Sequence, residues 1–466
     1  MRQGLIKILH SKMSVLFFGI ILTSLLQSCI SEDVKVSPPT IELHTGYTAR
    51  LTDEPSNTKW NIDNPTVATI STDGVLTAIK AGKATVYSVD SKGKQKVFCY
   101  LEVFPRRNIL FSIGGDNNLS GTSGTDGEPV QKINRIRTGW QQGNGEMIIF
   151  VDNGEGAFLL RVNETQGADG MLGLDTLKSY GMQNSASKDV LSMAINDFTS
   201  GYPADSYGMI FFSHASGWLP DGTLSQPRSL VIDVNGTPRE MEYYDFAAAI
   251  PDKQFDFIIL EACLMTDVMS MYDLRNKTDY VLASAAEIVS PGFEYTYQDT
   301  VMSLYNTKQS IDLTLQEFGQ AYFDRVPNVN YNAATLSLIK MSEMDNLAAV
   351  TKTALQGISV EEDNLKIHID SIQTFDRPLA LGGRPYSRFF DFGHAVQNII
   401  SDDQYKALDT QTGKTVIWKV ATKTFLPNQY GFEIKRHSGL TTYIEQSVYP
   451  YLNGKYRTSN WYQAIK

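Results

Sequence analysis

Short apolar runs, each closed by a polar residue, recur through the middle of the chain. Such runs are typical of strands buried on both faces of a sheet, and they lie at residues 108–113, 146–152, 207–212, 257–260 and 280–284. Apolar residues at helical spacing separate them, for example Leu191, Ile195 and Phe198. Alternating strands and helices predict an α/β fold with a mostly parallel sheet and helices on both faces.

Residues 30–105 follow a different pattern. Alternating strands are predicted at 40–43, 60–62, 67–70, 84–87 and 97–101, with turns such as Asp73-Gly74 between them. This pattern predicts a small all-β sandwich. Cys99 alternates with outward-facing residues and is expected in its core. A disulfide from Cys99 to Cys263 is not expected, because it would join two domains.

After residue 300 the pattern weakens. Helices are predicted at 313–326 and 341–355 and a strand at 416–420. We therefore expect residues 106–300 to form the α/β core and residues 301–466 to form an α/β extension packed on it.

A thiol follows the apolar run at 257–260. The strand predicted there ends at Glu261, and Cys263 lies two residues further on. A helix is predicted next, with apolar positions at Leu264, Val268 and Tyr272. Ligand clefts form at the carboxyl ends of strands in such sheets, and the free amides of a helix start lower a thiol pKa. Cys263 is thus a candidate nucleophile, and a small apolar residue in a packed turn is the alternative.

An imidazole ends a second run in the same way. His214 follows the strand predicted at 207–212. If the two strands are parallel neighbours, His214 and Cys263 lie side by side above the sheet, as a general base and a thiol nucleophile do. A structural histidine is the alternative.

These two blocks resemble the clostripain-like cysteine peptidases of the caspase and gingipain clan. That family has His-Gly-Ser-Gly-Trp and Asp-Ala-Cys-Leu-Met, where residues 214–218 read His-Ala-Ser-Gly-Trp and residues 261–265 read Glu-Ala-Cys-Leu-Met. Further similarity lies at 116–119, 284–295 and 439–443, so the resemblance runs from about residue 106 to the C-terminus. It implies a caspase-like α/β sandwich and catalysis by Cys263 and His214.

The resemblance also suggests how a substrate is held. The family's aspartate two residues before the cysteine is associated with cleavage after Arg or Lys, and Glu261 stands there in this chain. Glu287 is a weaker candidate for the cleft wall, and a solvated acid is the alternative. The backbone N–H groups of Ala215 and Cys263 are the expected oxyanion donors, provided that residue 215, glycine in the family, does not need a positive φ.

Between the two catalytic strands, residues 219–244 are rich in proline and are expected to form a surface loop beside the cleft. The family is activated by cleavage after a basic residue in this interval. Arg228 is the preferred site and Arg239 the other one, and a simple loop with two solvated arginines is the alternative.

Residues 1–29 have basic residues, a short apolar core and Ser28-Cys29, which resembles a bacterial lipoprotein signal. Cys29 would be acylated, and its lipid would hold the protein at the outer membrane or cell surface. A simple secretory signal is the alternative. Residues 64–70 and 74–82 resemble bacterial Ig-like domains of the second type, which are usually spacers.

The composition narrows the choice of partners. With 466 residues, 42% of them hydrophobic and 20% charged, the chain fits a folded protein of several domains. Its net charge of −10 argues against a nucleic-acid groove. Calcium dependence occurs in the resembled family, but no stretch resembles an EF-hand loop and no other cofactor is expected. His368, His394 and His437 lie singly, without the spacing of metal ligands.

The sequence thus predicts a surface-anchored cysteine endopeptidase that acts on protein or peptide substrates after Arg or Lys and processes itself between its two catalytic residues. The alternative is an inactive cell-surface binding or adhesion lipoprotein with a peptidase-like domain.

Overall fold

The structure is a computed structural model. It describes residues 37–52, 58–114, 119, 127–141, 143, 145–153, 155–223, 232–233, 239–329, 331–380 and 385–466. The chain forms two compact units, one made mainly of the residues up to Arg107 and the other of most residues from Asn108 onward. In the described residues, no helix has both the length and the apolar character needed to cross a membrane.

The first unit is the predicted small β-sandwich. One sheet has the order β1-β7-β6-β3 and the other β2-β5-β4. The strands are β1 (Thr40–His44), β2 (Thr48–Arg50), β3 (Lys59–Ile62), β4 (Ala68–Ile70), β5 (Val75–Ala78), β6 (Gly82–Val89) and β7 (Gln95–Phe104). Alternate residues of β7, including Cys99, are buried in the core between the sheets, as predicted.

A nine-stranded sheet is the centre of the second unit, in the order β11-β10-β9-β8-β12-β15-β16-β17-β19. Its strands are β8 (Arg107–Ile113), β9 (Met147–Asn153), β10 (Gly156–Gln166), β11 (Leu172–Gly181), β12 (Ser206–Phe212), β15 (Phe255–Glu261), β16 (Thr278–Ala283), β17 (Thr335–Lys340) and β19 (Val416–Ala421). The central pairs β8–β9, β12–β15 and β15–β16 are parallel. Antiparallel pairs close both edges.

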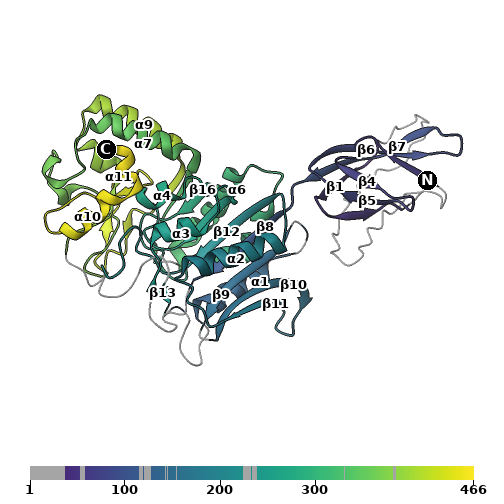
Figure 1. The fold of residues 1–466 in the computed structure, drawn as a ribbon, viewed down its shortest axis with the longest axis horizontal. Coiled ribbons are helices and arrows are strands. Elements are labelled where there is room, and N and C mark those ends of the chain that lie inside the picture. Colours follow the sequence, from purple (N-terminus) through teal and green to yellow (C-terminus); the bar gives the residue numbers. More distant parts are fainter. Residues whose placement is uncertain are drawn as a thin grey trace, which may run out of the picture. The chain divides into compact units, whose positions relative to one another are not determined.

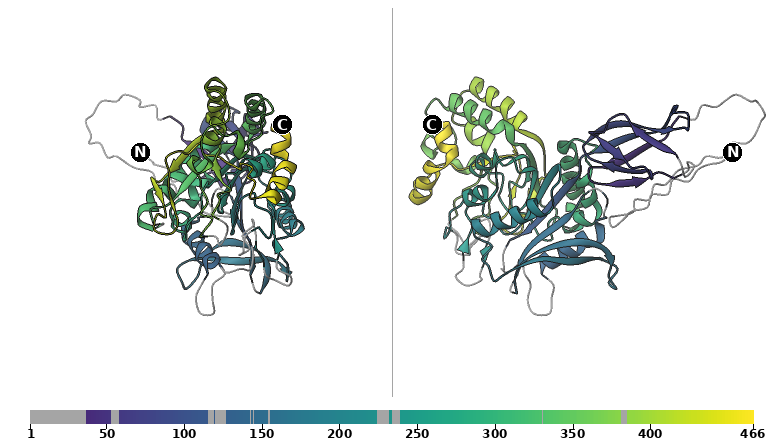
Figure 2. Two further views of the ribbon diagram at one scale, coloured as in Figure 1. Left: turned by 90° about the vertical axis from the view of Figure 1, so that its left-hand side faces the viewer. Right: turned by 45° about the vertical axis from the view of Figure 1, so that its right-hand side comes forward.

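Helices cover both faces of this sheet (Figure 1 and Figure 2). One face packs on α1 (Glu128–Gly139), α5 (Glu294–Thr300) and α6 (Ile311–Val329). The other packs on α2 (Lys188–Gly201), α3 (Tyr243–Ala249), α4 (Val268–Leu274), α7 (Met344–Leu355), α8 (Phe392–Gln397), α9 (Asp402–Thr415), α10 (Pro450–Thr458) and α11 (Asn460–Ile465). Two apolar cores result, because alternate residues of each central strand face opposite sides.

The smaller elements lie in the loops. They are the strands β13 (Ile232–Asp233), β14 (Arg239–Glu240), β18 (Phe390–Asp391), β20 (Thr424–Phe425), β21 (Phe432–Glu433) and β22 (Thr441–Thr442), and the 3₁₀ helices η2 (Val301–Tyr305), η3 (Met341–Glu343), η4 (Glu362–Asn364) and η5 (Ile369–Ser371).

The part of the chain after residue 300 enters the central sheet. β17 pairs antiparallel with β16, and β19 pairs antiparallel with β17. The predicted boundary at residue 300 therefore divides a single sheet. Residues 301–466 were expected to form an extension packed on the core, and two of their strands also extend its sheet by backbone hydrogen bonds.

Candidate active site

His214 and Cys263 follow two neighbouring parallel strands. In the register of β12 and β15, Phe212 lies opposite Glu261. His214 and Cys263 each come two residues after that pair, and both line a cavity of about 250 Å³. The prediction that these strands are parallel neighbours is confirmed. The sheet thus brings a thiol and an imidazole to the same edge, although 48 other residues separate them in the sequence.

The turn that carries Cys263 is fastened to the loop after β16. Leu264 has a left-handed backbone with φ 63°, which is rare for a residue with a Cβ. Its N–H donates to the Ala286 carbonyl at 3.0 Å. The N–H of Ile288 lies 3.4 Å from the Cys263 Sγ, which accepts its hydrogen bond. Cys263 is partly exposed, whereas Cys99 is buried. The thiol is therefore held by backbone contacts and open to the cavity.

The helix after Cys263 begins later than predicted. α4 starts at Val268, and the side chain of Asp267 accepts the Ser270 N–H at 2.8 Å. A turn of residues 263–266 separates the thiol from α4. The expected support of the thiolate by the opening amides of this helix has to be corrected, because the N-cap carboxylate takes one of them.

Beyond His214 the chain turns sharply at Gly217, where φ is 56°. A Cβ at this position would lie 2.5 Å from a ring atom of Phe389 and 2.6 Å from the Leu264 carbonyl oxygen. Glycine is thus required for both the conformation and the space. Ala215 is buried and is not among the described residues with a positive φ. An alanine is therefore compatible with this turn.

The Gly439–Tyr443 motif packs against both turns. The N–H of Thr441 donates to the Thr266 carbonyl at 3.0 Å. The ring of Tyr443 lies 4.8 Å from that of Trp218, measured between centroids. Three motifs that are far apart in the sequence thus meet at the carboxyl end of β12 and β15.

Glu261 lies in the wall of the cavity, but its carboxylate is already bound. Lys132 Nζ donates to Glu261 Oε1 at 2.7 Å, the Phe293 N–H donates to the same oxygen at 2.6 Å, and the Tyr297 hydroxyl donates to Oε2 at 2.5 Å. Glu261 is 2% exposed. Burial raises the pKa of Glu261, and Lys132, Tyr297 and the Phe293 amide oppose that rise. A direct contact with a substrate cation stays a prediction that these hydrogen bonds do not favour.

Glu287 also lines the cavity and is not the solvated acid that was the alternative. It is 7% exposed and accepts a hydrogen bond from Arg377 Nε at 2.6 Å. A second guanidinium nitrogen, Nη1 of Arg377, donates to the Gln429 carbonyl at 2.7 Å. This pair fixes one wall of the cavity.

Sequence reasoning missed Lys132, Tyr297 and Arg377. Lys132 and Tyr297 lie 129 and 36 residues from Glu261, and Arg377 lies 114 residues from Cys263. No local motif marks any of the three. A lysine between aliphatic positions of an amphipathic helix was the one available signal, because Lys132 lies beside Ile133 in α1.

Three predicted features lie wholly or mainly outside the described residues. They are the lipidation candidate Cys29, the processing candidate Arg228 and the motif at 116–119, of which Leu119 alone is described. The other processing candidate, Arg239, is exposed and lies in β14, where it pairs with Asp233 of β13.

Within the described ranges, no group of three or more His, Cys, Asp or Glu side chains is arranged to hold a metal ion. Of the three histidines after residue 300, His437 is partly buried, and desolvation lowers its pKa to about 3. His394 accepts the Gln373 N–H at 3.0 Å. The His394 contact is structural.

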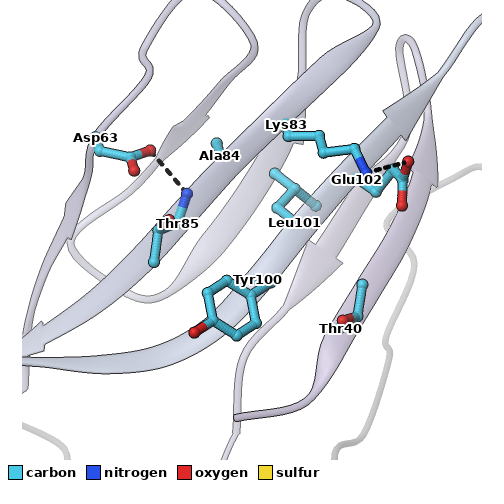
Figure 3. Close-up of a pocket in the computed structure, with 8 residues that line it drawn as sticks. All are labelled: Thr40, Asp63, Lys83, Ala84, Thr85, Tyr100, Leu101 and Glu102. Atoms are coloured by element: carbon cyan, nitrogen blue, oxygen red, sulfur yellow. Dashed lines mark hydrogen bonds and ion pairs between the residues drawn. The ribbon is translucent and has the colours of Figure 1, made fainter. Parts of the chain in front are cut away.

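A second hollow, of about 420 Å³, lies on the β-sandwich (Figure 3). Its polar groups bind one another: Lys83 Nζ lies 3.1 Å from Glu102, and the Thr85 N–H donates to Asp63 at 2.7 Å. Neither a thiol nor an imidazole is among the eight residues drawn. The hollow has no chemistry like that beside Cys263.

The chain matches two family models. The model of the clostripain family matches residues 113–462, and that of the bacterial Ig-like domain (group 2) matches residues 31–100. A comparison with curated proteins finds no match.

Solved structures agree with the larger match. An inactive zymogen C11 protease from Parabacteroides distasonis is 28% identical with a TM-score of 0.65, over 78% of this chain and 98% of that one. A secreted C11 cysteine protease from Bacteroides thetaiotaomicron, in complex with an irreversible peptide inhibitor, is 26% identical with a TM-score of 0.64, over 78% and 99% of the two chains. The chain therefore belongs to the clostripain family of cysteine peptidases and carries an Ig-like domain before its peptidase domain.

Proposed function

We propose that the protein is an endopeptidase in which Cys263 is the nucleophile and His214 the general base and acid. The supporting observation is the register of β12 and β15, which brings both residues to one cavity. His214 accepts the thiol proton while the sulfur attacks the peptide carbonyl carbon. It then donates a proton to the leaving amine, and water releases the acyl group from the sulfur.

The backbone N–H groups of Ala215 and Cys263 are proposed to stabilise the oxyanion. The neighbouring N–H of Leu264 does not serve this purpose, because it donates to Ala286. Alanine donates as well as the glycine that the family has at residue 215, since the turn does not need a left-handed conformation there.

Replacement of the nucleophile tests this proposal. We expect Cys263→Ala and His214→Ala to lower kcat/KM for fluorogenic peptides by about 10³-fold or more, because the chemical step loses its attacking or proton-transferring group. Cys99→Ala is the matched control. Cys99 is the second cysteine of the described structure and lies in the Ig-like domain, so its replacement should leave activity unchanged.

The same assay separates the two functions considered from the sequence. If the wild-type protein and Cys263→Ala are equally inert toward peptides, the chain is a binding or adhesion protein with a peptidase-like domain. Peptide turnover by the wild-type protein that is lost in Cys263→Ala supports the enzyme.

Export and processing complete the proposal. An anchor at Cys29 and a spacer built from the Ig-like domain would hold the peptidase domain at the cell surface, where it meets proteins and peptides. A secreted relative agrees with export. Cleavage is proposed after Arg228 rather than Arg239, because peptidases cleave extended loops and Arg239 is paired in β14. Cleavage after Arg or Lys of other proteins stays a prediction from the resemblance.

A further inference from the structure

A buried lysine binds Glu261, which lines the cavity beside Cys263. The side chain of Lys132 has no exposed surface. Its Nζ donates to Glu261 Oε1 at 2.7 Å and to the Pro291 carbonyl at 2.8 Å, and lies 3.6 Å from Glu128. The same nitrogen lies 4.4 Å from the centroid of the Phe212 ring. Two carboxylates, a carbonyl and an aromatic face thus surround one ammonium group.

These are the partners that a pocket would offer to a basic side chain of a substrate. Phe212, Glu261, Glu128 and Gly292 all line the cavity that holds Cys263. Lys132 therefore already neutralises the carboxylate on which binding of a substrate cation was expected to depend.

Glu261 already accepts three hydrogen bonds, so a second cation would have to share the carboxylate with Lys132. Oε1 receives Lys132 and the Phe293 amide, and Oε2 receives Tyr297. The pair of Lys132 and Glu261 is neutral overall, whether the shared proton lies on the ammonium or on the carboxyl group. Glu287, the third carboxylate of the cavity, is neutralised by Arg377.

Glu128 carries the remaining negative charge. Its side chain is 21% exposed and already attracts Lys132. A substrate ammonium or guanidinium that reached Glu128 would have to approach the Lys132 ammonium as well, and like charges repel strongly where water is scarce. Glu128 is thus a poor substitute for an uncompensated carboxylate in the cavity.

Lys132 is held in place by the fold. It lies in α1, whose Ile133 and Ile136 are buried in one core of the sheet. On the same helix, Arg135 Nε donates to Glu294 of α5 at 2.9 Å. Gly139 packs directly on the backbone of Gln298. Contacts on two sides thus hold α1, and with it Lys132, in place.

We propose that Lys132 is a specificity-determining residue that neutralises the pocket beside Cys263, so that the enzyme cleaves after uncharged side chains in preference to Arg or Lys. This inference rests on the proposed peptidase function. It replaces the preference expected from the resemblance, and it implies that cleavage after Arg228 is carried out by another peptidase.

A peptide series tests the inference on the full chain. The peptides differ only in the residue before the cleaved bond, which is Arg, Lys, Gln, Leu or Ala. We expect wild-type kcat/KM to be about tenfold or more higher for the uncharged residues. In Lys132→Ala, where Glu261 loses its ammonium partner, kcat/KM for Arg and Lys peptides relative to uncharged peptides should rise about tenfold or more.

Two further variants assign the effect to a residue. In Lys132→Ala combined with Glu261→Gln, the gain for Arg and Lys peptides should disappear. In Glu128→Gln the wild-type order of substrates should stay the same. Thermal melts of each variant check the fold, and the wild-type series decides the matter even if Lys132→Ala does not fold.

Wild-type cleavage that is fastest after Arg or Lys would overturn the inference and leave the peptidase function intact. Loss of that preference in Glu128→Gln would then identify Glu128 as the substrate carboxylate. If the wild-type protein cleaves no peptide and Cys263 is not labelled by a thiol-reactive peptide, the proposed function fails, and this inference with it.

Discussion

Buried carboxylates in the peptidase domain differ in what compensates their charge. Glu261 has a lysine at 2.7 Å. Asp267 has the N–H and the hydroxyl of Ser270, at 2.8 and 2.7 Å, and its pKa is raised to about 7 by burial. Asp152, at the end of β9, faces a second carboxylate, Asp233. Burial and this neighbour raise the pKa of Asp152 to about 8. A second carboxylate rather than a cation faces Asp152, so a pH dependence of stability is expected there.

The Asp152 pair predicts that stability falls as pH rises. The folded pKa of about 8 lies above the ordinary value of 3.8, so the folded state binds the proton more tightly than the unfolded chain. The resulting stabilisation is complete below about pH 4 and is lost as pH rises to about 8. Asp152→Asn should reduce the loss of unfolding free energy between pH 5 and pH 8 by about 2–4 kcal/mol.

Urea unfolding at the two pH values measures this difference. The exposed Asp189 provides the control, because Asp189→Asn should keep the wild-type dependence on pH. If the unfolding free energy changes equally with pH in the wild type and in Asp152→Asn, protonation of Asp152 does not cause the pH dependence.

At the level of whole elements, the peptidase sheet depends on strands from both ends of the domain. β17 and β19 cover the edge of β16, and α7 and α9 to α11 contribute to the core on one face. Without them β16 would present unpaired N–H and carbonyl groups, and buried apolar side chains would meet water.

Truncation at residue 300 should therefore abolish folding. A fragment of residues 106–300 is expected to be insoluble or to lack a cooperative thermal transition, whereas residues 106–466 should fold and keep the peptidase activity. Circular dichroism melts and the peptide assay compare the two fragments. A soluble, cooperatively folded 106–300 fragment would contradict the single-sheet description.

The molecule as a whole consists of two units with separate cores. The Ig-like core contains residues of the β-sandwich alone, and the two large cores of the second unit lie on the faces of its central sheet. Events before residue 106 should therefore leave the chemistry at Cys263 unaffected. This independence fits a domain that acts as a spacer between an anchor and an enzyme.

The anchor predicted at Cys29 can be tested on this basis. We expect Cys29→Ser to move the protein from the membrane fraction to the soluble fraction with unchanged kcat/KM, because the acyl chains bind the membrane by burying methylene groups. Cys99→Ser should remain with the membranes. A Cys29→Ser protein that still sediments with the membranes would contradict a lipid anchor.

Local pattern was sufficient for much of the fold. The apolar runs at 207–212 and 257–260 became the buried strands β12 and β15, because a run without polar residues fits only where both faces are covered. Their polar ends, His214 and Cys263, came together because parallel strands end at one edge. The alternating residues of β7 placed Cys99 in the sandwich core for an equally local reason.

The tertiary structure decided what surrounds those residues. Whether Glu261 meets a substrate or a neighbour depends on Lys132, which lies on another helix, and on Tyr297 of α5. Likewise, no pattern near Val416–Ala421 indicates that this strand completes the sheet that begins at residue 107. The spacing of apolar residues along the chain indicates which side of a helix or strand is buried. The charge balance of a pocket depends instead on side chains that only folding brings within hydrogen-bonding distance.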